Sequence, residues 1–365
     1  MDSVLKVDLK ENSYNIIFEK SFDSLARRLA EIGAPKKLLV VTDTNVGRLY
    51  GGEITELLTA AGYDAAAHVF EAGEKSKGMD TILGICGACL EHKMDRKSMI
   101  IALGGGVVGD MAGFAAAIFM RGIRFVQIPT TLLSQSDSSV GGKTGIDFGG
   151  SKNILGAFHQ PKLVYINVVT LRTLPEREFI SGMGEVIKHG IIRDGNFFDY
   201  LENNADKIKS LDDDTLMYMA RVNCAIKAAV VSEDEQETGL RAILNFGHTV
   251  GHAVESAADF ALTHGACVGI GMCAAARIAQ RRDMLSAEAE KRIKRVLELY
   301  GFDTSVRDIA EEQIYEHMGR DKKSSGGRLK FVLPAGIGEV RIFDDVTRAE
   351  IEDAVRSVIC GGRNK

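Results

Sequence analysis

Several features that define whole classes of protein are missing from this sequence. No run of about 18 apolar residues occurs, and the opening stretch MDSVLKVDLKENSYNIIFEK has no apolar core behind a basic start. We therefore expect neither a transmembrane helix nor a secretory signal, and we predict a cytoplasmic protein. A basic excess is also missing, because the formal net charge is −5 and the sequence pI is about 6.0. Nucleic acid is therefore not an expected partner.

Cysteine is scarce as well, with six residues in a chain of 365. That number is too small for a disulfide scaffold, and it agrees with a reducing compartment. Cys86 and Cys89 form a C-x-x-C pair, which in a redox protein would follow a strand at the start of a helix. Here the pair lies within MDTILGICGACLEHK, which has the pattern of an amphipathic helix. We expect both thiols to be inert and to serve helix packing.

The residues that are present indicate two globular parts. The composition, 45% hydrophobic and 26% charged, is ordinary, and 365 residues suffice for two domains. In the first half, apolar stretches such as KKLLVVTD and SMIIALGGG alternate with helical stretches, which predicts a parallel sheet with right-handed crossovers. From about residue 176 the pattern changes to long helices. We therefore predict an α/β domain over residues 1–176 and a mostly α-helical domain over residues 177–365.

A glycine-rich turn follows a buried strand in the first half. Gly104, Gly106 and Gly109 have the G-x-G-x-x-G spacing, directly after an apolar run and at the start of a predicted helix. Such a turn lets a pyrophosphate approach the backbone, where the helix N-terminus offers N–H donors. No acidic residue ends the next strand, where a ribose partner would stand, but Asp43 ends an earlier strand and could take that part. A tight turn with close helix packing is the structural alternative.

The passage SQSDSSVGGKTGIDFGGSKNILGAF is predicted to be a long loop, and loops of this length in compact domains tend to be functional. The passage and the residues just before it gather charged and amide groups suited to a phosphorylated or carboxylated substrate. These are Arg121, Asp137, Lys143, Lys152 and Asn153. A solvated loop with ordinary surface lysines is the alternative.

The helical half holds a candidate metal site. His248 and His252 stand one helical turn apart in NFGHTVGHAVE, and His264 follows in LTHGACVGIGM. Glu185 lies between glycines and apolar residues in SGMGEVIKHG, where an unpaired carboxylate would be costly. A catalytic zinc takes three ligands of these types and keeps one position open. Spacing alone does not say which histidines bind metal, and each residue taken singly is more often structural.

Other residues of this half add to the candidate site. Gly247 and Gly251 share the spacing of the two histidines on the neighbouring face, which predicts the close approach of another helix. Further polar candidates are Lys188, Lys227, Glu237, Arg241, Asn245, Lys322 and Lys323. The last two belong to a charged run, and such a run is usually solvated surface.

Together these residues resemble the 3-dehydroquinate synthases, the sugar-phosphate cyclases of the shikimate pathway. The resemblance runs through most of the chain in order, in blocks such as GGGVVGD, TLPEREFISGMGEVIKHG and EDEQETGLRAILNFGHTVGHAVE. Several long blocks in the correct order are far more specific than a single glycine motif. The resemblance implies a Rossmann-like N-terminal domain and a helical C-terminal domain. It also implies an active site in the cleft between them that holds NAD and a divalent metal, with zinc expected and cobalt as the alternative.

The resemblance further implies roles for individual residues. The metal ligands would be Glu185, His248 and His264. The substrate contacts would be Arg121, Asp137, Lys143, Asn153, Lys188, Lys227, Arg241, Asn245, His252 and Lys322, and the catalytic members of this group Lys143, Lys188, Lys227, Arg241, Asn245 and His252. The NAD contacts would be Asp43, Asn45, Glu74, Lys75, Gly105, Gly106, Val107, Asp110, Thr130, Thr131, Asp137, Lys143, Lys152, Thr170, Thr173 and Leu174. A homodimer is expected in which Arg121 reaches the neighbouring active site, and Glu255 is left without a role.

The family's reaction converts 3-deoxy-D-arabino-heptulosonate 7-phosphate into 3-dehydroquinate and phosphate, on the route to chorismate and the aromatic amino acids. NAD is reduced transiently and regenerated, phosphate is eliminated, and ring opening is followed by an intramolecular aldol closure. The enzyme expected from the resemblance is thus a carbon–oxygen lyase with no net redox change.

Three alternatives stand beside this expectation. Other sugar-phosphate cyclases act on glucose 6-phosphate or sedoheptulose 7-phosphate, which lack the carboxylate to be recognised. A polyol or glycerol-phosphate dehydrogenase would accumulate NADH. A zinc hydrolase would need no NAD, and the sequence lacks the H-E-x-x-H pattern because Thr249 follows His248.

Overall fold

The computed structural model describes residues 3–237, 239–259, 261–324 and 329–360, with the backbone alone for residues 320–324. By compactness the chain divides into two units. The first comprises Met1–Leu174 and Leu216–Gln236, and the second comprises Pro175–Thr215 and Glu237–Lys365. The predicted domain boundary after residue 176 remains a prediction. Among the described residues, no helix combines the length and apolarity needed to cross a bilayer.

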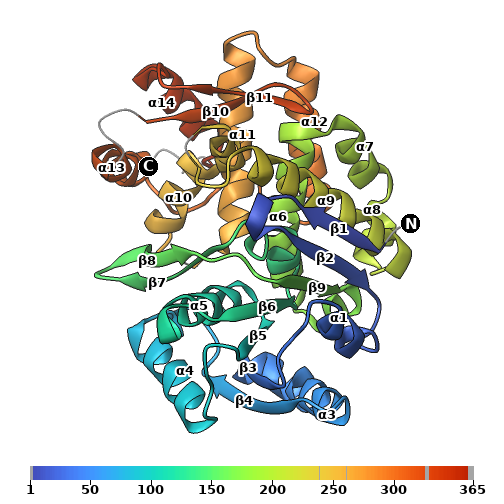
Figure 1. Ribbon diagram of the computed structural model, residues 1–365. Coiled ribbons are helices and arrows are strands. Elements are labelled where there is room, and N and C mark those ends of the chain that lie inside the picture. The colour runs from blue at the N-terminus through green and yellow to red at the C-terminus, as the bar shows by residue number, and fades with distance from the viewer. Residues whose placement is uncertain (1–2, 238, 260, 325–328, 361–365) are drawn as a thin grey trace. The chain divides into compact units, whose positions relative to one another are not determined.

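The first unit is built on a seven-stranded sheet in the order β1-β2-β9-β6-β5-β3-β4 (Figure 1). Its strands are β1 (Val4–Val7), β2 (Tyr14–Glu19), β3 (Lys37–Asp43), β4 (Asp64–Phe70), β5 (Met99–Gly104), β6 (Arg124–Pro129) and β9 (Leu163–Asn167). From β2 to β4 the neighbouring strands run parallel, and β1 adds an antiparallel edge to β2. The predicted α/β fold with a parallel sheet is confirmed.

Helices and short helical turns connect these strands. They are η1 (Lys10–Asn12), α1 (Leu25–Glu31), α2 (Thr44–Val46), η2 (Gly47–Gly51), α3 (Gly52–Ala60), η3 (Glu74–Ser76), α4 (Met79–Glu91), α5 (Gly106–Ile118), η4 (Phe119–Arg121), η5 (Ser134–Ser138) and η6 (Val168–Thr173). The sheet has an apolar core on each face, because successive side chains of a strand point to opposite sides. On β3, Leu39 and Val41 join the core that includes α4 and α5, whereas Leu38 and Val40 join the core that includes α1 and α3.

The strand order changes direction next to β3. From β3 the chain moves outward to β4, returns across β3 to β5, and then continues through β6 to β9 on the other side. Ligands of open α/β sheets bind beyond the carboxyl ends of the strands at such a reversal. The ends of β3 and β5 therefore mark where a nucleotide would be held in this unit.

A two-stranded hairpin replaces most of the predicted long loop. Strands β7 (Lys143–Phe148) and β8 (Ser151–Phe158) pair antiparallel, and the expectation of a loop without secondary structure is wrong here. Thr144, Gly145 and Ile146 are buried in β7, which also contacts α5. Packing against α5 thus buries one part of β7 and stabilises the hairpin, although the polar sequence of this segment does not predict strands.

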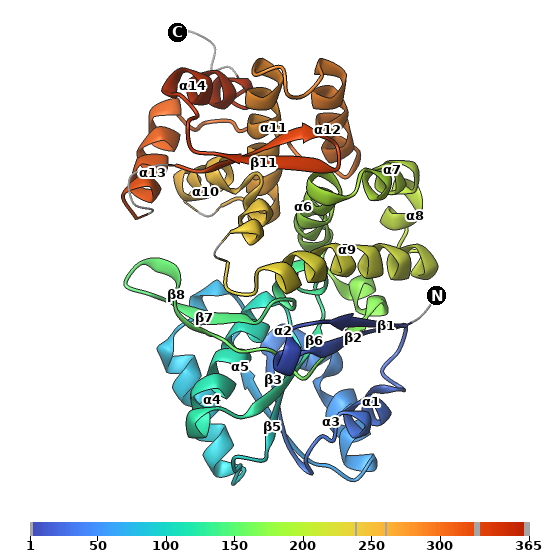
Figure 2. The ribbon, with the colours of Figure 1, turned by 45° about the horizontal axis from the view of Figure 1, so that its top comes forward.

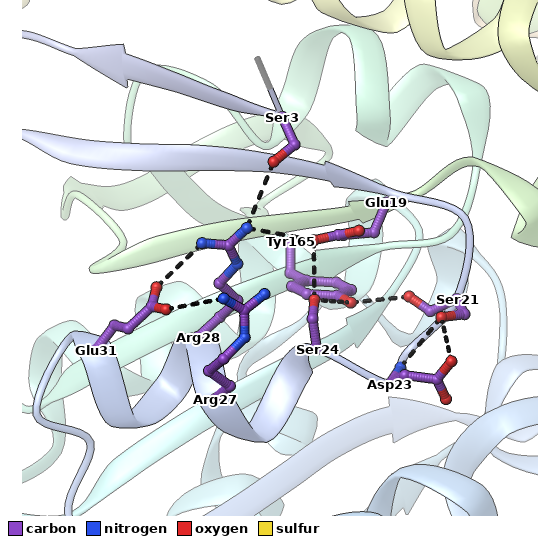
Figure 3. Close-up of polar contacts among 9 residues, drawn as sticks. All are labelled: Ser3, Glu19, Ser21, Asp23, Ser24, Arg27, Arg28, Glu31 and Tyr165. Carbon is purple, nitrogen blue, oxygen red and sulfur yellow. Dashed lines mark hydrogen bonds and ion pairs between the residues drawn. The ribbon is translucent and has the colours of Figure 1, made fainter. Parts of the chain in front are cut away.

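Hydrogen bonds attach helix α1 to strands β2 and β9 of the sheet (Figure 3). The Tyr165 hydroxyl, on β9, donates to the carbonyl of Ser21 and lies 2.9 Å from the Ser24 hydroxyl, which in turn donates to Glu19. Arg28 extends this network from α1, with nitrogens 3.4 Å from Glu19 and 3.2 Å from Glu31. These contacts join α1 and β2, which are consecutive in the sequence, to β9, which follows more than a hundred residues later.

The second unit is mostly helical (Figure 2). Its elements are α6 (Glu176–Arg193), α7 (Gly195–Asn203), α8 (Ala205–Lys209), η7 (Leu240–Asn245), α10 (His248–Ala257), α11 (His264–Arg281), α12 (Ala287–Leu299), α13 (Glu311–Ser324), β10 (Phe331–Gly336), β11 (Glu339–Phe343) and α14 (Arg348–Ser357). Helix α9 (Asp213–Glu233) begins in this unit and continues into the part of the chain that belongs to the first. Helix α11 contacts α6, α10, α12, α14 and β10, so it forms the centre of the unit.

Glycine allows two neighbours of α11 to approach it closely. A Cβ on Gly251 of α10 would lie 2.8 Å from the Cys267 carbonyl, and one on Gly184 of α6 would lie 2.9 Å from the Gly265 carbonyl. The predicted approach of another helix at Gly251 is therefore confirmed. Because Gly184 precedes Glu185 and Gly265 follows His264, the second crossing also sets the separation of two candidate metal ligands.

Candidate active site

The residues predicted to contact NAD lie at one edge of the sheet of the first unit. Each group of them follows the carboxyl end of a parallel strand. Asp43 and Asn45 follow β3, Glu74 and Lys75 follow β4, Gly105, Gly106, Val107 and Asp110 follow β5, Thr130, Thr131 and Asp137 follow β6, and Thr170, Thr173 and Leu174 follow β9. Lys143 and Lys152 lie instead at the start of β7 and in β8, and both are exposed.

The glycine-rich turn forms the start of α5. Gly105 stands at the N-cap position, and no side chain caps the first turn of the helix. A Cβ on Gly109 would lie 2.7 Å from Oε1 of Gln127, so this helix packs against β6 more closely than any side chain would allow. The Asp43 carboxylate, on the strand beside β5, accepts hydrogen bonds from the backbone of Asn45 and Val46 at 2.9 and 2.8 Å. Backbone N–H groups at the start of a helix fit an anionic nucleotide, whereas the contact at Gly109 agrees with the alternative of close helix packing.

A buried lysine that the sequence reasoning overlooked lies among these residues. Lys77 is 6% exposed, and its Nζ lies 2.7 Å from Asp110 and 3.9 Å from Glu74. The predicted contact Lys75 is exposed. Burial raises the pKa of Asp110 although the Lys77 charge opposes that rise. The available signal was the three-residue spacing of Glu74 and Lys77, which puts both on one side of a helical turn.

Two predicted substrate residues meet within the first unit. The Lys227 ammonium, 5% exposed on α9, donates to the Asp137 carboxylate at 2.7 Å and also to the Asp137 carbonyl. Asn153 is exposed on β8 with a left-handed φ of 53°, and Arg121 is exposed at the end of η4 with a φ of 68°.

The second unit brings the three predicted metal ligands together. Glu185, on α6, is 1% exposed, and its Oε1 lies 3.4 Å from Nε2 of His264 and 3.6 Å from Nε2 of His248. Both carboxylate oxygens are buried, and Lys188 forms an ion pair with Oε2. Ligand atoms about 2.0–2.1 Å from a tetrahedral zinc lie roughly 3.4 Å apart, so these separations suit a metal ion.

The protonation states also suit a cation. Burial alone would raise the pKa of Glu185, but the charges of Lys188 and the two histidines hold it well below its usual range. Burial, with the Lys188 charge, lowers the pKa of His248 to about 3, so this imidazole is neutral. Burial alone would lower the pKa of His264, but contacts with Glu185 and Glu255 raise it to about 9. An ionised carboxylate and a neutral imidazole are the forms that bind metal, so His264 would have to release a proton to serve as a ligand.

The predicted substrate residues of the second unit occupy varied positions. The ring of His252, one turn after His248, lies 5.1 Å from that of His248 and 5.8 Å from that of His264, and its side chain is exposed. Arg241 is 2% exposed in η7, and Asn245 is exposed at the end of the same turn. Lys322 belongs to α13, but its side chain and that of Lys323 lie outside the described part of the chain.

The cysteines are free, and those of the C-x-x-C pair lie in the middle of α4, as predicted. Cys89 is fully buried, and burial raises the pKa of its thiol to about 12. Burial also raises the pKa of Cys86. Neither thiol forms an appreciable amount of thiolate at neutral pH, so this pair is unsuited to redox chemistry.

Comparison with known proteins identifies the family. Residues 67–181 match the family model for the 3-dehydroquinate synthase N-terminal domain, and residues 182–324 match that for the C-terminal domain. The 3-dehydroquinate synthase of Ruminiclostridium cellulolyticum is 49% identical over 92% of this chain and 93% of its own. That of Acetivibrio thermocellus is also 49% identical, over 97% and 98%.

A solved structure agrees with these relatives. The 2-epi-5-epi-valiolone synthase of Streptomyces hygroscopicus subsp. jinggangensis, solved with NAD+ and Zn2+ bound, superposes with a TM-score of 0.88. It is 29% identical to this chain and covers 96% of it, with 98% of its own length matched. With both family models matched in order and relatives similar over nearly their whole length, the chain belongs to the 3-dehydroquinate synthase family.

Proposed function

We propose that this protein converts 3-deoxy-D-arabino-heptulosonate 7-phosphate into 3-dehydroquinate and phosphate, with NAD and a divalent metal as cofactors. The observation that carries the proposal is the convergence of three donor groups in a buried position: Oε1 of Glu185 faces the Nε2 atoms of His248 and His264, while Lys188 pairs with the other carboxylate oxygen. One carboxylate oxygen and two imidazole nitrogens form the ligand set of a catalytic divalent metal.

We assign Glu185, His248 and His264 as the metal ligands, with zinc as the expected ion and cobalt as the alternative. We assign NAD to the carboxyl edge of the sheet, where the predicted contacts follow five neighbouring strands. When bound, the metal supplies Lewis acidity toward substrate hydroxyls, and NAD supplies reversible oxidation of one of them. The fit to NAD rests on the start of α5, where Gly105 stands at the N-cap position without a side-chain cap hydrogen bond.

The chain's own residues hold and orient the substrate in this proposal. Lys227 is fixed by Asp137, so its ammonium is already ordered before substrate arrives. Lys188 balances the charge of Glu185 in a buried setting. Hydrogen bonds and positive charge for the carboxylate and phosphate come from the other predicted substrate residues, which are His252, Asn245, Lys143, Asn153, Arg241 and Lys322. A flexible intermediate held in one conformation then closes its ring by an orientation effect.

The subunit arrangement is a separate part of the proposal. Arg121 follows two exposed apolar residues, Ile118 at 44% and Met120 at 43% exposure. Exposed apolar side chains beside an arginine fit a contact between subunits, and we propose a homodimer in which Arg121 serves the neighbouring active site. The proposed location is the cytoplasm.

Mixing two inactive variants tests the role of Arg121. In a heterodimer of Arg121→Ala and His252→Ala, one active site would have both an intact His252 and the arginine of the other subunit. Activity should therefore return on mixing, toward about a quarter of the wild-type value if subunits exchange at random. Two variants that stay inactive when mixed, although subunit exchange is demonstrated, would contradict this arrangement.

Phosphate release tests the reaction. The purified protein with NAD and zinc should release phosphate from the heptulosonate phosphate in step with product formation, without accumulating NADH. No release, or stoichiometric NADH, would overturn the proposal. Glucose 6-phosphate and sedoheptulose 7-phosphate serve as controls for the other cyclases, and we expect neither to react because each lacks the carboxylate.

A further inference from the structure

Glu255 is a buried carboxylate to which the proposed mechanism gives no role. It lies on α10, seven residues and two helical turns after His248, and it is 7% exposed. Its Oε2 lies 3.5 Å from Nδ1 of His264, the first residue of α11. A carboxylate is seldom buried without a charged or hydrogen-bonding partner, and one partner of Glu255 is a candidate metal ligand.

His264 lies between two carboxylates, with one ring nitrogen toward each. Nε2 lies 3.4 Å from Oε1 of Glu185, and Nδ1 lies 3.5 Å from Oε2 of Glu255. A histidine binds one metal ion through one ring nitrogen, and the partner of the other nitrogen selects the tautomer and fixes the ring plane. A carboxylate at Nδ1 keeps the proton there and leaves the Nε2 lone pair for the metal.

His248 has the same arrangement with a different partner. Its Nε2 lies 3.6 Å from Oε1 of Glu185, and its Nδ1 lies 3.1 Å from the carbonyl oxygen of Phe246. Both imidazoles therefore direct Nε2 toward the same oxygen and have an acceptor at Nδ1. The repetition of this geometry from two different helices argues that the partner of each Nδ1 is part of the site.

A second role for Glu255 must be weighed, since His252, Glu255 and His264 also have potential ligand atoms within 4.8 Å of one another. In that group Glu255 would itself bind the ion. The Glu185 group is favoured because Glu185 is almost fully buried and the Nε2 atoms of two histidines face its Oε1. His252, by contrast, is an exposed member of the second group.

We propose that Glu255 is a positioning residue, which holds His264 with its proton on Nδ1 so that Nε2 binds the metal. The inference rests on the proposed metal site of Glu185, His248 and His264. Removing such a partner typically weakens metal binding by about 10- to 100-fold without removing a ligand.

The test compares Glu255→Gln, which removes the charge but keeps the size, with Glu185→Gln, which removes a proposed ligand. Zinc affinity is measured by competition with a chromophoric chelator, and the cobalt form of each protein is examined by visible absorption. We expect Glu255→Gln to bind one zinc at saturation with about 10- to 100-fold lower affinity. Its cobalt spectrum should shift, because the donor strength of His264 changes. Glu185→Gln should lose stoichiometric binding.

Glu350→Gln is the control for a general loss of stability. It removes a charge that pairs with Arg282 in the same unit without contacting the candidate ligands, so zinc affinity and the cobalt spectrum should stay at wild-type values. If it shifts them as much as Glu255→Gln does, the effect reflects stability and the inference is wrong. Unchanged affinity and spectrum in Glu255→Gln, or loss of its bound zinc even at saturation, would also overturn the inference while leaving the metal site in place. A wild-type protein that binds no divalent metal would overturn both the proposed metal site and the positioning role of Glu255.

Discussion

Nζ of Lys77 lies 2.7 Å from Oδ2 of Asp110, joining the turn after β4 to the first turns of α5. Lys77 is nearly inaccessible to solvent, whereas Lys75, two residues earlier, is exposed. The ion pair thus orders both segments beside the glycine turn at which we place the pyrophosphate.

Substitution of Lys77 should therefore weaken NAD binding. Lys77→Met leaves Asp110 without its cationic partner in a setting where burial already raises the pKa of that carboxyl, so the pKa rises further and the helix start loses its support. We expect an affinity loss of about 10-fold or more, near 1.4 kcal/mol, by calorimetric titration with NAD. Lys75→Met is the matched control and should stay within about 2-fold of wild type. Equal losses in the two variants would contradict the assignment.

The two histidines of α10 should separate metal binding from turnover. His248→Ala removes an imidazole whose Nε2 faces Glu185, so metal should be lost on gel filtration. His252→Ala should keep one metal per chain and lower kcat by about 100-fold or more, because its role is to stabilise charge on the substrate. Metal analysis and phosphate release, measured for both variants, show which histidine is needed for metal binding and which for turnover. Loss of metal from His252→Ala would assign that residue to the ligand set instead.

A methyl group at Gly184 should disturb the candidate metal site although Gly184 is not itself a ligand. The new Cβ would lie 2.9 Å from the Gly265 carbonyl, so α6 and α11 must move apart and Glu185 moves away from His264. We expect Gly184→Ala to lose about 1–3 kcal/mol of stability and to weaken zinc binding. Gly319→Ala is the control, since nothing lies within 4 Å of its added Cβ. Denaturant unfolding and chelator competition measure the two effects.

The ion pair between Arg282, at the end of α11, and Glu350 should make the free energy of unfolding depend on pH in the acidic range. Hydrogen bonds from Arg282 lower the pKa of Glu350 from 4.5 to about 2, so the pair contributes stability above pH 4.5 that is lost as the pH falls toward 2. Both side chains are partly exposed, at 19% and 23%, so we expect about 1 kcal/mol. Glu350→Gln should lose this amount at pH 7 and should unfold with a smaller pH dependence below pH 4.5. An unchanged pH profile would contradict the assignment.

The thiols should differ sharply in reactivity. With a pKa of about 12, Cys89 has about one thiolate in ten thousand molecules at pH 8, and it is buried. Cys360 is exposed beside Ser305. We expect rapid labelling of the native protein by a disulfide reagent to disappear in Cys360→Ser and to be unchanged in Cys86→Ser. Rapid labelling of Cys86 or Cys89, located by peptide mapping, would revive a redox role for the pair.

The parallel sheet was predictable because its inner strands β3, β5 and β6 are buried on both faces and therefore have continuous apolar runs. The hairpin β7–β8 was not, because its sequence is polar and α5 supplies the packing that stabilises it. The sequence also gave no means of choosing between Lys75 and Lys77, since the choice depends on which side of a single helical turn meets Asp110.

The metal group was partly predictable. The spacing of His248 and His252 shows that both can enter one region, but only the fold shows which ring nitrogen faces Glu185. Glu255 stands close behind the two histidines in the sequence, but its role could not be predicted because its partner His264 lies on another helix beyond a turn. The predicted substrate contact of Lys322 lies outside the side chains that the structure describes.

The two candidate histidine ligands, His248 and His264, differ in whether a mutation can remove the acceptor at Nδ1. The acceptor at Nδ1 of His248 is a main-chain carbonyl, which is present whatever side chain stands at position 246. The acceptor at Nδ1 of His264 is a side chain, and single-base changes in a glutamate codon can replace it with glutamine or lysine. Variation in metal affinity among descendants of this protein should therefore arise more readily through position 255 than through position 246, with all three ligands retained.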